Sequence, residues 1–209
     1  MTDPFFFSVA KAILSPAIKL VGFAYELFHR PSVSYKRAPK NLFAHIKPGA
    51  SMARVKDLLG SPHQETDGQY RYAFSEVCVQ VDSADKTTVD SVSVGLRGVA
   101  RRNRFPVWPI NDLLLGKTTF ASLIEESDKV IFDYSSKFYH FYIVKYYGFP
   151  GLYWNYALGY LECPGVSPDG YHWSPDAQSR DEIPKKMTIN WACVTRLDEP
   201  PSFAYYGFL

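Results

Sequence analysis

The sequence predicts an α+β protein, with an amino-terminal hydrophobic helix followed by two units that each combine a short helix with an antiparallel sheet. Residues 5–28 are strongly apolar and carry polar residues at helical spacing. Residues 46–64 contain a short helical pattern bounded by Gly and Pro, and alternating apolar residues follow it. Most of the 15 Tyr, 15 Phe and 4 Trp lie after Phe120, which predicts a second half rich in strands.

These patterns divide the chain of 209 residues into four parts. We expect an amphipathic or hydrophobic helix at residues 1–30, a basic linker at 31–42, a helix-plus-meander unit at 43–98, and an aromatic-rich unit at 106–209. Residues 1–60 contain nine Lys or Arg and three acidic residues, so the positive charge is concentrated at the front of the chain.

The apolar segment at residues 5–28 allows two interpretations. Its polar residues recur every three or four positions, so they form one narrow stripe on a helix whose remaining surface must be buried. Asp3 and the interrupting lysines disfavour a signal peptide, and the charge-free middle is far shorter than the ~20 residues that span a bilayer. The helix therefore packs against the protein or a second copy of it, or it lies in a membrane interface.

The membrane interpretation also predicts a basic patch near lipid headgroups. Its candidate residues are Lys11, Lys19, Arg30, Lys36 and Arg37. A solvated linker explains the same charges, and the segment lacks the interleaved aromatic residues of a nucleic-acid platform, which disfavours a nucleic-acid partner.

The first unit begins with the stretch IKPGASMARVKDLLGSPHQ. Ser51 is a good N-cap, apolar residues recur at three- and four-residue steps from Met52, and Gly60 with Pro62 ends the helix. A helix of this length is unstable alone and must pack on a sheet. Alternation at residues 70–74, 77–81 and 89–96 predicts a three-stranded meander to receive it.

This unit resembles the SmpA/OmlA (BamE) family and, more generally, the β-lactamase-inhibitor-protein-like fold, over about residues 43–96. The matching residues are Ile46, Gly49, Ser51, Val55, Leu59, Gly60 and Pro62. The resemblance implies a short helix that opens onto a meander. Envelope members carry a signal and a lipidated cysteine near the amino terminus, which this sequence does not show, so the resemblance implies the fold and does not imply the outer-membrane role.

The resemblance suggested a search for a second copy, and a degenerate one begins at about residue 110. Residues 114–124 repeat the order of an apolar pair, Gly116, a Thr cap and a short apolar helix. Strands are then expected at residues 129–133, 137–147, 154–161 and 187–196, with a long loop at 163–184. The prediction is therefore a tandem of two units.

The sequence contains no recognisable catalytic motif. Cys78, Cys163 and Cys193 have unrelated spacings, which disfavours disulfides or zinc and fits a reducing cytoplasm. The five His lack metal-pair spacing, and no nucleophile elbow or phosphate loop is present. We therefore predict no catalytic residues, no metal and no cofactor; the enzymatic alternative uses the 163–184 loop, with His172 and Asp169 or Asp176 as acid and base.

The function predicted is non-catalytic protein binding in the cytoplasm, as an inhibitor, an immunity factor or a scaffold. Outward-facing Tyr and Trp on strands, together with the centre of the long loop, would supply the contacts. The candidate partner-binding residues are Tyr139, Tyr142, Tyr147, Tyr153, Trp154, Tyr171, His172 and Trp173. The alternatives are an aromatic core without a binding role and a peripheral membrane protein anchored by residues 5–28; self-association also remains open.

Overall fold

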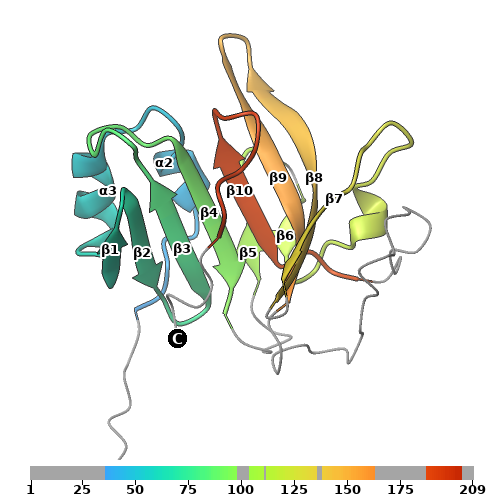
Figure 1. Ribbon diagram of the computed structural model, residues 1–209, viewed down its shortest axis with the longest axis horizontal. Helices are drawn as coiled ribbons and strands as arrows, with labels where there is room; N and C mark the ends of the chain where they lie inside the picture. Colours follow the sequence, from blue (N-terminus) through green and yellow to red (C-terminus); the bar gives the residue numbers. More distant parts are fainter. Residues whose placement is uncertain (1–35, 98–103, 111, 136–137, 163–186, 204–209) are drawn as a thin grey trace, which may run out of the picture. The chain divides into compact units, whose positions relative to one another are not determined.

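An eight-stranded sheet, in which every neighbouring pair of strands is antiparallel, organises the computed structural model (Figure 1). The structure describes residues 36–97, 104–110, 112–135, 138–162 and 187–203. All of them belong to one compact unit, Tyr35–Leu209. The predicted amino-terminal helix lies outside the described residues.

The strand order in the sheet is β1-β2-β3-β4-β10-β9-β8-β7. The strands are β1 (Gln64–Thr66), β2 (Gln69–Ala73), β3 (Val77–Asp82), β4 (Ser91–Leu96), β7 (Ile131–Ser135), β8 (Phe138–Phe149), β9 (Leu152–Glu162) and β10 (Trp191–Thr195). A separate two-stranded sheet joins β5 (Phe105–Pro106) to β6 (Leu114–Leu115). The helices are α2 (Leu42–His45), α3 (Met52–Leu59) and the 3-10 helix η1 (Phe120–Ser122).

The helix and the meander predicted for the first unit are both present. Ser51 caps α3, because its side-chain oxygen accepts a hydrogen bond from the Arg54 amide at 3.3 Å. Gly60 ends the helix with a φ of 86°, a backbone conformation that glycine adopts without strain. Strands β2, β3 and β4 follow as consecutive antiparallel neighbours, so local sequence signals specify this region correctly.

The predicted fold class is wrong, because the two halves form one sheet and not two helix-plus-sheet units. Strand β10 pairs with β4 on one side and with β9 on the other. Trp191, for example, lies opposite Gly95 of β4 and Gly159 of β9. The four strands expected in the second half are found, but their sheet is continuous with the meander of the first half.

The helix predicted at residues 114–124 is also absent, apart from the single turn η1. The backbone groups that this helix would need are used in pairing with residues 187–189. The Gly116 amide donates to the Ile189 carbonyl at 2.7 Å, and the Phe120 amide donates to the Met187 carbonyl at 2.8 Å. Thr119 also forms an antiparallel bridge with Thr188, so this segment runs alongside the residues that precede β10. The predicted tandem repeat therefore does not form.

The two faces of the sheet differ in chemistry. One face, which we call the apolar face, carries aliphatic residues of the central strands and packs in one cluster with buried residues of α2 and α3. Its central members are Val79, Val81, Val92, Val94, Ile143, Leu158 and Val194. The other, which we call the mixed face, combines Trp191, Tyr142 and Phe203 with small and polar buried side chains, namely Cys78, Gln80, Asp82, Ser91, Ser93, His140, Cys193 and Thr195.

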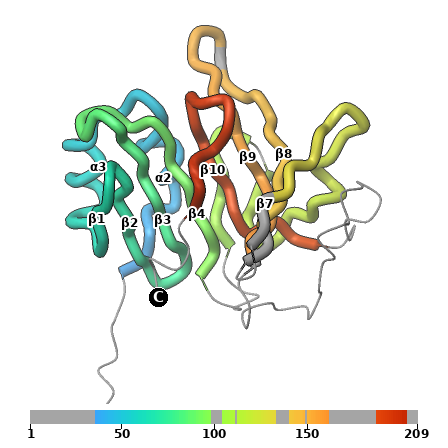
Figure 2. The backbone as a smooth tube through the Cα atoms, viewed as in Figure 1, coloured from blue at the N-terminus to red at the C-terminus, as the bar shows by residue number. Residues whose placement is uncertain are grey.

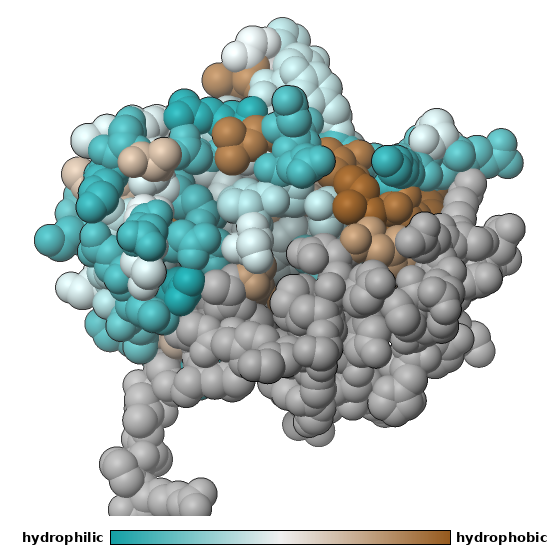
Figure 3. All heavy atoms as spheres, viewed as in Figure 1, coloured by the Kyte–Doolittle hydropathy of each residue, from teal (hydrophilic) through white to brown (hydrophobic). Residues whose placement is uncertain are grey.

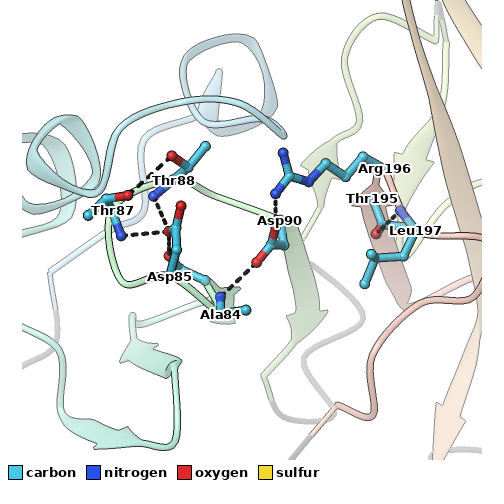
Figure 4. Close-up of polar contacts among 9 residues, drawn as sticks. Ala84, Asp85, Thr87, Thr88, Asp90, Thr195, Arg196 and Leu197 are labelled. Atoms are coloured by element: carbon cyan, nitrogen blue, oxygen red, sulfur yellow. Dashed lines mark hydrogen bonds and ion pairs between the residues drawn. The ribbon is translucent and has the colours of Figure 1, made fainter.

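A turn between β3 and β4 is tied to the end of β10 (Figure 4). The Asp85 carboxylate accepts hydrogen bonds from the Thr87 and Thr88 amides at 2.8 and 2.7 Å, as is common in turns, and these bonds lower the pKa of this carboxyl. Asp90 accepts from the Ala84 amide at 2.7 Å and pairs with Arg196. The turn and the carboxyl end of β10 are thus held together.

In the part of the chain that the structure describes, no helix is long and apolar enough to cross a membrane.

Candidate functional site: an aromatic hairpin

The β8–β9 hairpin is longer than the strands beside it. Strand β7 pairs with β8 only as far as Tyr142, and β10 pairs with β9 only from Asn155 onward. The rungs from Tyr147–Trp154 to Phe149–Leu152 therefore extend beyond both neighbouring strands, and Tyr146 lies at the edge of this extension. Figures 1 and 2 show this hairpin projecting past its neighbours.

Large hydrophobic side chains are exposed at this tip. The exposed fractions are 68% for Tyr146, 52% for Leu152 and 44% for Tyr153. The Tyr146 and Tyr153 rings stack, with centroids 5.1 Å apart and an interplanar angle of 17°. No charged residue occurs from Tyr146 to Tyr156. In Figure 3 the tip carries pale and brown residues, in contrast to the hydrophilic surface over β1–β3.

The opposite side of the tip is also aromatic but is packed against the body of the sheet. Tyr147 lies opposite Trp154 in the register, and its ring meets Tyr156 edge-on at 5.8 Å. The Lys47 ammonium lies over two indole rings, 5.1 Å from the centroid of Trp108 and 5.1 Å from that of Trp154. Side chains from three separate segments therefore meet on this side.

Polar contacts fix the base of the hairpin. The Lys145 ammonium pairs with Asp128 at 2.7 Å and with Glu125 at 3.2 Å. Burial opposes the charge on Lys145, but the hydrogen bonds and charges of the two carboxylates outweigh burial and raise its pKa. On the other strand, the Asn155 amide donates to the Leu197 carbonyl at 2.9 Å. These contacts orient the tip without placing a free charge on it.

Three buried titratable groups of the mixed face are poorly suited to catalysis at neutral pH. Burial lowers the pKa of His140 to about 3, so the ring is neutral and is a poor general acid or base near pH 7. Burial also raises the pKa of the Cys78 and Cys193 thiols to about 12, which suppresses the nucleophilic thiolate. No group of three or more His, Cys, Asp or Glu among the described residues could hold a metal ion.

The structure distributes the predicted partner-binding residues over several environments. Tyr153 is exposed at the tip, Trp154 and Tyr147 are partly buried on the apolar face, and Tyr142 is only 7% exposed on the mixed face. Tyr139 lies in β8, and its side chain is outside the described residues. Tyr171, His172 and Trp173 also lie outside them, as do Asp169 and Asp176 of the enzymatic alternative.

The predicted basic patch is described only in part. Lys36 and Arg37 are exposed, whereas Lys11, Lys19 and Arg30 lie outside the described residues.

Four further residues belong to this site, namely Tyr146, Leu152, Trp108 and Lys47. Tyr146 and Leu152 could have been selected from sequence, because the Gly148 and Gly151 pair marks a turn and the residues flanking a turn lie at the exposed end of a hairpin. Trp108 and Lys47 carry no such signal. They reach the hairpin from distant parts of the chain, through packing alone.

Comparisons of the chain with family models, with curated proteins and with solved structures gave no match. The resemblance of residues 43–96 to the SmpA/OmlA family therefore stays a prediction from its motif residues.

Proposed function

We propose that this protein is a non-catalytic protein-binding module that engages its partner through the tip of the β8–β9 hairpin. The observation that carries the proposal is the exposed set of Tyr146, Leu152 and Tyr153 on a segment that extends beyond the sheet. Tyr dominates binding hot spots, because it offers a large contact area and a hydroxyl at little cost in conformational entropy. An inhibitor, an immunity factor or a scaffold would use such a surface.

The shape and chemistry of the tip favour a partner with an apolar recess. The stacked Tyr pair is already ordered before binding, which reduces the entropy lost on association. The absence of charge from Tyr146 to Tyr156 means that no ion has to be desolvated when the tip is buried. We place this binding in the cytoplasm as part of the proposal, since Cys78 and Cys193 are buried free thiols.

The test compares two variants by affinity purification from native cells, with soluble and membrane fractions analysed separately. Tyr146→Ala with Tyr153→Ala removes the stacked pair, and Leu58→Ala removes an exposed apolar residue on α3, away from the hairpin, as a control. We expect a defined protein to co-purify with the wild type and the control, and its recovery to fall about tenfold or more with the hairpin variant.

Equal recovery with the hairpin variant and the wild type would contradict the proposal. A membrane role makes a different prediction, because the wild-type chain would then co-sediment with vesicles of phosphatidylcholine and phosphatidylserine. Loss of vesicle binding on deletion of residues 1–30, but not on substitution of Tyr146 and Tyr153, would support the amino-terminal segment as a membrane anchor in place of the hairpin.

A further inference from the structure

We propose that Trp108 and Trp154 form a binding site for an organic ammonium group, and that Lys47 occupies this site in the free protein. The inference concerns the apolar-face side of the hairpin and does not depend on the partner proposed for the Tyr146–Tyr153 tip. Its basis is the position of the Lys47 ammonium, 5.1 Å from the centroids of both indole rings.

The geometry is that of a two-walled aromatic cage. A cation within ~6 Å of an indole centroid is attracted by the negative face of the ring, and Trp is the strongest of the aromatic side chains in this role. The two walls come from separate elements. Trp154 lies in β9, whereas Trp108 follows β5 in a turn closed by a 3.1 Å hydrogen bond from the Ile110 amide to the Val107 carbonyl. The backbones that carry the two walls are thus held by the sheet and by this turn, independently of Lys47.

The chemistry of the occupant follows from what surrounds its charge. Among the described residues, the ion pairs involve Lys145 and Arg196, and none reaches Lys47. In this part of the chain, the Lys47 ammonium is therefore held by the faces of the two neutral indole rings. A site that holds an ammonium through ring faces without a carboxylate favours a weakly hydrated cation, since a methylated ammonium is desolvated more easily than a primary one.

Lys47 is suited to act as a displaceable occupant. Its neighbours Ile46 and Pro48 are buried, and its carbonyl accepts the Ala50 amide at 3.0 Å, so its backbone is fixed. The head group reaches the rings through a flexible stem of four carbons, which can swing into solvent without moving that backbone. Trp108 is 37% exposed, so this wall of the site is in contact with solvent.

The experiment titrates the full chain with choline while the indole N–H resonances are followed by NMR, with Trp108→Phe and Trp154→Phe used for assignment. The key variant is Lys47→Ala, which empties the site, and Lys56→Ala on α3 is the matched control. We expect choline to shift the Trp108 and Trp154 resonances saturably in Lys47→Ala and to leave the buried Trp191 resonance unchanged. In the wild type and in Lys56→Ala the affinity is about tenfold weaker, because Lys47 competes.

A neutral isostere of choline distinguishes a site that binds the positive charge from a site that binds only apolar groups. The alcohol 3,3-dimethyl-1-butanol has the shape of choline without its charge, so we expect it to bind Lys47→Ala at least about tenfold more weakly. Equal binding of the two compounds would overturn the proposal. Equal affinity of choline for the wild type and Lys47→Ala would also overturn it, as would the absence of any shift in a Lys47→Ala chain whose other indole resonances are native.

A second titration distinguishes two sources of the ammonium group, a methylated protein segment and a choline-containing molecule. A short peptide that contains trimethyllysine is titrated beside free choline. Tighter binding of the peptide identifies a methylated protein segment as the natural source, and tighter binding of choline identifies a small metabolite or a lipid headgroup. If Lys47→Ala does not fold, the wild-type titration carries the test, since displacement of Lys47 predicts shifts of the same two resonances at higher choline concentration.

Discussion

The two faces of the central sheet are buried to a similar degree but are built from different chemistry. On β10, Val194 faces the aliphatic cluster, whereas Cys193 lies on the mixed face between Ser93 and Ala157. On β3, Val79 and Val81 alternate with Cys78, Gln80 and Asp82. We infer that the apolar face supplies most of the folding free energy through hydrophobic burial, while the mixed face supplies conformational specificity through hydrogen bonds and titratable groups.

The largest expected effect is on the apolar face. Leu158 is fully buried and lies opposite Ile143 in the register of β8 and β9. Leu158→Ala removes buried methyl groups and leaves a cavity, so it should lower the free energy of unfolding by about 3 kcal/mol. Urea denaturation at pH 7 measures this change. A loss below about 1 kcal/mol would show that the apolar face is not the main source of stability.

The second prediction concerns His140 on the mixed face. Its pKa is about 3 in the folded chain and near 6.5 when exposed, so the unfolded state binds the proton more readily between these values. The contribution of neutral His140 to the free energy of unfolding is therefore fully present above pH 6.5 and declines as the pH falls toward 3. Between pH 7 and pH 5 this one ring should cost about 2 kcal/mol.

The His140→Phe variant isolates this contribution. Phenylalanine keeps the ring packing against Tyr142 and Trp191, whose centroids are 5.0 and 4.3 Å from that of His140. It also removes a buried nitrogen, Nε2, that lacks a hydrogen-bond partner. We expect urea denaturation of the variant to show about 2 kcal/mol less loss between pH 7 and pH 5. An unchanged pH dependence would mean that His140 does not govern it.

The smallest expected effect compares neighbours on one strand. Val194→Ala should cost about 2 kcal/mol, because it removes two methyl groups from the apolar face. Cys193→Ala removes only a sulfur atom from a region of small side chains, so a cost of about 1 kcal/mol is expected. Both values come from urea denaturation at pH 7 with reducing agent. If Cys193→Ala is the more damaging variant, the contrast between the faces does not hold.

The parts of the fold that depend on local signals were predicted from the sequence. The cap at Ser51, the stop at Gly60 and the alternation of the valines specify α3 and the meander within about fifty consecutive residues. The strands of the second half were also predicted, although β8 and β9 extend closer to their common turn than expected. Each of these features needs only neighbouring residues.

The joining of the two halves could not be predicted in the same way. The pairing of β10 with β4 brings Trp191 opposite Gly95, and no local pattern specifies which edge a strand will choose. The apolar residues at 120–124 suit a helix, but they form only the single turn η1, because Gly116, Thr118 and Phe120 direct backbone groups to residues 187–189. At the hairpin, alternation predicted that some of the tyrosines face outward, whereas the exposure of Tyr146 depends on where β7 and β10 end.

The central place of β10 has a consequence for synthesis on the ribosome. Residues 91–96 and 152–162 leave the exit tunnel long before residues 191–195, so each half of the sheet waits with an unpaired edge. The last strand closes both edges at once, which makes the final step of folding depend on contacts that are distant along the chain. A nascent chain that stops before residue 191 would expose two unpaired strand edges, which can pair with other chains. Chaperones would bind the chain in that state.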